Sequence, residues 1–125
     1  MWKAIVKIIN NTDYYVSISG VGPGNEDISG GETVSWMSTE VNNTKSIVFW
    51  HTKGVDYMQG NLSFGPEAGV YVDRGWMAED DQSIKMTAVA GGETFVQTTN
   101  GGKELLAWNQ FENGGTITLT FDPIQ

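Results

Sequence analysis

The stretch Thr116-Ile117-Thr118-Leu119-Thr120-Phe121 decides the fold, because three apolar side chains alternate in it with three threonines. Successive side chains of a β-strand point to opposite faces, so this alternation predicts a strand with one buried face. The same period of two recurs in residues 58–64 and 84–88, and again in residues 3–9 near the N-terminus. Several separate segments therefore carry the pattern of half-buried strands.

About ten such runs, rich in β-branched and aromatic residues, follow one another between turns. Glycine marks the turns: 16 of the 125 residues are glycine, and the pairs Gly30-Gly31 and Gly91-Gly92 suit the positive φ of tight turns. No window keeps the apolar spacing of an α-helix. We therefore predict an all-β fold, a single antiparallel β-sandwich domain over residues 1–125. The expected strands lie near 2–10, 14–21, 32–38, 45–52, 57–64, 69–74, 83–90, 93–98, 103–109 and 115–122.

The composition excludes several classes of function. Seven basic and fifteen acidic residues give a formal net charge of −8, which excludes nucleic-acid binding and a polybasic membrane clamp. The chain has no cysteine, and His51 is its only histidine, with no nucleophile motif beside it. We therefore expect a protein that is not an enzyme and that has no cofactor and no catalytic or metal site.

The first residues lack the long apolar segment of a signal peptide, and no apolar run has the length of a membrane helix. We therefore expect a chain that is made soluble without a signal peptide.

Trp76 and Met77 lie in a charged, glycine-containing segment, residues 73–81. Tryptophan combines a large apolar body with one polar N–H, and it is favoured in cores, at interfaces and at membrane surfaces. Exposing a Trp-Met pair in such a loop is unfavourable unless it contacts something. The pattern predicts a ligand or membrane contact here, with packing over the edge of the sandwich as the alternative.

Arg74 is the only arginine, and its planar fork suits a phosphate or carboxylate head group. It is equally suited to a surface ion pair with Asp73 or Glu79. The run Glu79-Asp80-Asp81 offers carboxylate oxygens for Ca²⁺, but its consecutive spacing is more typical of a solvated turn.

Three segments, taken in order, share the pattern of one known family. Trp2 leads alternating aliphatic residues into Asn10, residues 70–76 place aromatic residues around an aspartate after a strand, and residues 109–118 run from a Gly-rich turn into a Thr-Ile-Thr strand. In their order and spacing they resemble the aegerolysins, a family of small acidic β-sandwich proteins. That family includes components of binary insecticidal toxins.

The chain departs from the family pattern after residue 73. Gly75 stands where the family usually has proline, and Met77-Ala78-Glu79 replaces a Gly-Ser-Lys run that helps to form the family's lipid head-group site. Because the replacement is acidic, it disfavours anionic membranes. Neutral or zwitterionic lipids, or a protein receptor, fit it better.

The resemblance implies a lipid- or receptor-binding protein that acts extracellularly at target membranes. It implies one component of a binary cytolysin or insecticidal toxin, which permeabilises the membrane together with a larger pore-forming partner. Trp2 and Trp76 match aromatic positions of the family, and Tyr71 and Asp73 lie beside them. With the loop residues added, the expected lipid-binding set is Trp2, Tyr71, Asp73, Arg74, Trp76 and Met77.

Two other functions fit the same residues. A lectin would use tryptophan faces with Asp and Asn side chains, and the chain is rich in all three. A self-assembling structural protein would suit strands rich in Gly, Asn and Thr. Homo-oligomerisation is a further expectation, because the edges of a sandwich need protection.

Overall fold

The computed structural model describes residues 2–19, 26–38, 41, 45–53, 56–66, 69–73, 84–97, 104–107 and 111–123. Within these ranges the chain forms eleven strands and no helix, which confirms the all-β prediction. The strands are β1 (Ile5–Asn10), β2 (Val16–Ser19), β3 (Glu26–Ile28), β4 (Thr33–Met37), β5 (Lys45–Lys53), β6 (Asp56–Gly65), β7 (Gly69–Asp73), β8 (Ile84–Ala90), β9 (Glu93–Gln97), β10 (Glu104–Ala107) and β11 (Thr116–Pro123).

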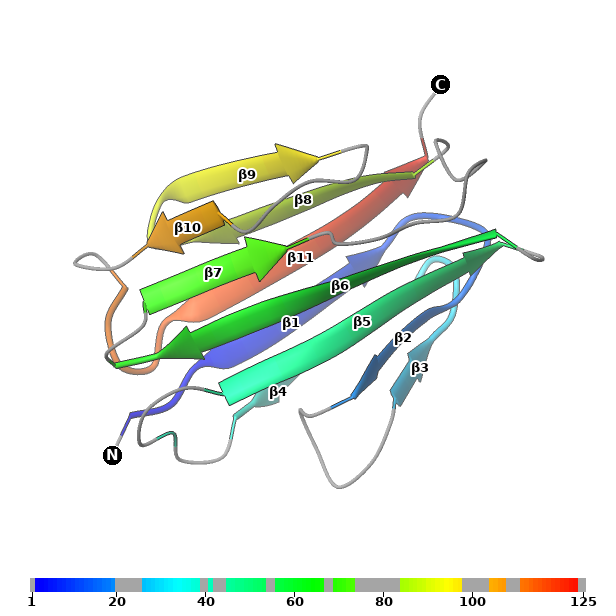
Figure 1. Cartoon of the computed structure of the whole chain (residues 1–125). Coiled ribbons are helices and arrows are strands. Elements are labelled where there is room, and N and C mark those ends of the chain that lie inside the picture. Colours follow the sequence, from blue (N-terminus) through cyan, green and yellow to red (C-terminus); the bar gives the residue numbers. More distant parts are fainter. Residues whose placement is uncertain are drawn as a thin grey trace.

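The strands form two sheets that lie face to face as a β-sandwich (Figure 1). The five-stranded sheet has the order β4-β1-β11-β8-β9, and the six-stranded sheet has the order β10-β7-β6-β5-β2-β3. The ten expected strands are all present. β3 is an additional strand that the sequence does not predict, because its three residues, Glu-Asp-Ile, carry only one apolar side chain and show no alternation.

One strand pair corrects the expectation of an antiparallel sandwich. β1 and β11 pair in parallel, from Ile5 opposite Thr116 to Asn10 opposite Phe121. The other described pairs are antiparallel. Strands joined by a tight hairpin must be antiparallel, whereas β1 and β11 are connected through nearly the whole chain. Their relative direction is therefore free of any hairpin constraint.

The core lies between the two sheets and follows the alternation of the strands. In β11, Ile117, Leu119 and Phe121 are fully buried, as the sequence predicts, while the threonines between them point away from the core. The rings of Phe121 and of Phe49 in β5 meet edge to face, with centroids 5.7 Å apart. Because the two rings come from different sheets, this contact joins the layers.

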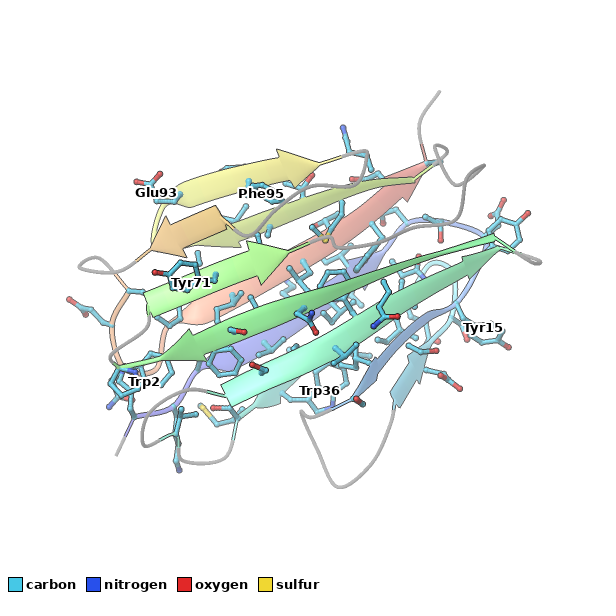
Figure 2. The ribbon with its side chains drawn as sticks, in the orientation of Figure 1. Trp2, Tyr15, Trp36, Tyr71, Glu93 and Phe95 are labelled. Carbon is cyan, nitrogen blue, oxygen red and sulfur yellow. The ribbon has the colours of Figure 1, made fainter. Side chains whose placement is uncertain are left out.

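The pairing of the strands shows which residues lie at each of the two ends of the sandwich (Figure 2). At the tryptophan end, β1 begins, close to Trp2 and to residues 111–115. At the tyrosine end, β1 passes through residues 11–15 into β2, and residues 29–32 link β3 to β4. Trp2 and Tyr15 lie at these opposite ends in Figure 2.

Candidate functional site

The tyrosine end is organised by one buried side chain, Asn10, at the end of β1. Its amide Nδ2 donates to the backbone carbonyl oxygens of Tyr14, at 2.6 Å, and Ile28, at 3.0 Å. Its Oδ1 accepts from the backbone nitrogen of Thr12, at 3.0 Å, and from the Thr12 hydroxyl, at 2.6 Å. A single residue thus holds the β1–β2 turn and ties it to the end of β3.

The second turn, residues 29–32, is held against the first by backbone contacts. The amide of Gly31 donates to the Asn10 carbonyl at 2.7 Å, and the Asn10 amide donates to the Glu32 carbonyl at 3.0 Å. Gly30 lies so close to the first turn that a Cβ there would collide with the carbonyl oxygen of Thr12. Only glycine fits this position, so the two turns form one rigid surface.

A shallow pocket of about 170 Å³ opens between these turns, lined by Asp13, Tyr14, Tyr15, Ser29 and Gly30. Tyr14 is 39% exposed and Tyr15 is 58% exposed, so two adjacent aromatic side chains face solvent on a fixed backbone. The pocket lining carries one carboxylate and no basic group. Two tyrosines, one carboxylate and a serine hydroxyl border it, a set that suits a small neutral or cationic ligand.

Trp2, the first of the sequence-predicted site residues, packs onto the core at the tryptophan end. Its ring is partly buried, with centroids 6.1 Å from Phe64 of β6 and 5.7 Å from Phe111. Its backbone forms a bridge with Val41. These contacts give Trp2 a packing role, and its contact with lipid stays a prediction.

Tyr71 and Asp73 lie in β7. Val70 and Val72 are fully buried, and Tyr71 lies between them on the outer face, half-buried and opposite Ser63. Trp2 contacts the inward-facing Phe64, so Trp2 and Tyr71 lie on opposite faces of the six-stranded sheet. Asp73 pairs through its backbone with Asn61, and its side chain lies outside the described residues.

Arg74, Trp76 and Met77 lie outside the described residues, as does the run Glu79-Asp80-Asp81. The described strands on either side of it are β7, which ends at Asp73, and β8. β7 runs away from the tryptophan end. β8 begins at Ile84, which pairs with Pro123. This pair lies past Phe121, which is opposite the last residue of β1, Asn10. The end of β7 and the start of β8 therefore both lie away from Trp2.

The tyrosine pair was not among the predicted site residues, because Tyr14 and Tyr15 were expected inside a strand near 14–21. The strand begins at Val16. The available signal was the polar run Asn10-Asn11-Thr12-Asp13 directly before two aromatic residues. Asn, Asp and Thr bond to nearby backbone groups and favour turns, so adjacent tyrosines are carried on a turn.

No protein-family model, curated protein or solved structure matches this chain. The described segments include no helix with the length and hydropathy to cross a membrane. Within the same segments, no three acidic or histidine side chains gather into a group able to hold a metal ion.

Proposed function

We propose that this chain is a binding module that recognises the head group of a membrane lipid through its tyrosine end. The observation that carries the proposal is the pair of exposed tyrosines, Tyr14 and Tyr15, beside a pocket on a turn held by buried Asn10. A fixed turn presents these rings without a large loss of conformational entropy on binding.

Tyrosine suits the boundary between water and lipid, because its ring is apolar and its hydroxyl is polar. A net charge of −8 gives no general attraction to anionic membranes. Binding must therefore come from specific contacts with a neutral or zwitterionic head group.

The resemblance to aegerolysins extends the proposal. In the extended proposal, the chain is the lipid-recognising component of a binary cytolysin, and a larger partner forms the pore. The chain acts outside the cell that makes it.

Co-sedimentation with phosphatidylcholine and sphingomyelin vesicles tests the proposal. We expect the unaltered chain to pellet with the vesicles, and the double variant Tyr14→Ala/Tyr15→Ala to stay in the supernatant. The matched control is Met37→Ala in β4, which removes a side chain that is 54% exposed near the tryptophan end. Loss of binding in the control as well, or no binding of the unaltered chain to either vesicle, contradicts the proposal.

A further inference from the structure

We propose that the pocket at Tyr14 and Tyr15 takes a quaternary ammonium group, such as the cationic end of a choline head group. Asp13 supplies the opposite charge. The inference rests on the proposed function, because it names the head group that the same site recognises.

The size of the pocket limits its ligand to one small group. At about 170 Å³ it is smaller than the roughly 300–1,000 Å³ of clefts that enclose drug-sized ligands. An acyl chain or an oligosaccharide would extend far beyond it. A trimethylammonium group is compact and nearly spherical, which suits a shallow hollow between two turns.

The charges around the pocket favour a cation. Asp13 is the only ionised side chain among the five residues that line it. The acidic character of the whole chain adds a weaker, longer-range attraction for cations.

Three backbone amides at or beside the pocket donate hydrogen bonds inside the protein, which disfavours an anion there. Ser29 donates its amide hydrogen to Glu32 Oε1 at 2.8 Å, Gly31 to the Asn10 carbonyl at 2.7 Å, and Tyr14 to the Thr12 hydroxyl at 3.3 Å. A phosphate or carboxylate site needs such donors turned toward the ligand. Here these three donors instead stabilise the turns themselves.

The two tyrosines select a methylated cation over an unmethylated one. Aromatic side chains attract cations through the ring quadrupole, and quaternary ammonium groups are the usual ligands of aromatic cages. A primary ammonium is a strongly hydrated point charge, so it loses more hydration on entering the site. We therefore expect choline to bind more tightly than ethanolamine.

Titration of the full chain with choline, ethanolamine and methyl glucoside, followed by NMR of the Tyr14 and Tyr15 ring signals, tests the inference. We expect saturable shifts with choline and weaker ones with ethanolamine. Tyr14→Ala/Tyr15→Ala should weaken choline binding about tenfold, the size of two exposed cation–π contacts. Tyr14→Phe/Tyr15→Phe should bind as the unaltered chain does, because the rings remain.

Asp13→Asn tests the counter-charge and should weaken choline binding about threefold, as for a solvent-exposed ion pair. Its matched control is Glu112→Gln, which removes the same charge from an exposed residue at the tryptophan end and should leave choline binding unchanged. Equal effects of the two variants overturn the assignment of Asp13. Unchanged far-UV circular dichroism and urea midpoints establish that the variants are folded.

Vesicles separate this inference from the proposed function. Equal binding to phosphatidylcholine and phosphatidylethanolamine vesicles, with no ring shifts from choline, overturns the ammonium assignment and leaves lipid recognition standing. Ring shifts from choline without binding to any vesicle support the pocket and overturn the proposed function. Saturable shifts from methyl glucoside alone overturn the ammonium assignment in favour of a lectin.

Discussion

Replacement of Asn10 by alanine should strongly destabilise the tyrosine end of the protein. Asn10 is fully buried and makes four hydrogen bonds, two through Nδ2 and two through Oδ1. A typical intramolecular hydrogen bond contributes about 1 kcal/mol net, and a buried group left without a partner costs about 1–3 kcal/mol. Because water can reach part of this turn after the change, we expect a loss of about 3–4 kcal/mol in the free energy of unfolding.

Urea denaturation followed by tryptophan fluorescence measures this loss. With an m-value of about 1–3 kcal/mol/M for a small domain, Asn10→Ala should lower the urea midpoint by about 2 M. The matched control is Asn11→Ala. Asn11 is the neighbouring residue, is exposed, and bonds through its side chain to Asp122 Oδ1 at 2.8 Å, so its loss should cost under about 1 kcal/mol. Equal midpoints for the two variants would refute the reasoning that the buried amide holds this end together.

Three further predictions concern packing and can be measured by the same denaturation assay. Gly30→Ala should lower the free energy of unfolding by about 2 kcal/mol or more, because the added Cβ would collide with the Thr12 carbonyl oxygen. Its control, Gly92→Ala, has open space around the Cβ and a φ of 84°, so it should lower the free energy of unfolding by about 1 kcal/mol through backbone strain alone. Leu119→Ala should cost about 2–5 kcal/mol, and Thr118→Ala, on the opposite face of β11, under about 1 kcal/mol. Trp2→Ala should lower the free energy of unfolding by about 2–4 kcal/mol, because the ring contacts with Phe64 and Phe111 are lost, and should leave choline binding unchanged. Loss of choline binding in a folded Trp2→Ala chain would contradict the separation of the two ends.

The strands could be predicted from the sequence because their signal is local. In β11 and in β1, the alternation of apolar and polar side chains matches the alternation of buried and outward-facing residues. The parallel pairing of these two strands had no such signal, because it depends on contacts between the two ends of the chain. β3 was missed for a related reason: it is held by its pairing with β2, with Ile28 opposite Val16, and its own pattern is too short to read.

The candidate site was predicted only in part. Trp76 and Arg74 were predicted as site residues because of their uncommon side chains, and both lie outside the described residues. Lipid contact by Trp2 stays a prediction, and the structure adds that its ring packs against Phe64 and Phe111. The turn that carries Tyr14 had a local signal in the polar run before it, whereas the pocket had none, because it forms between two turns that Asn10 holds together across the fold.

The most direct test of the account is to find which end of the protein meets the membrane. The amide signals of the full chain can be recorded by NMR with vesicles of phosphatidylcholine that carry a spin label at the head group. Recognition through the tyrosine end predicts strong broadening of residues 11–16 and 29–31 and little change in residues 2–5 and 111–115. Broadening confined to the residues around Trp2, or spread evenly over both sheets, would contradict recognition through the tyrosine end.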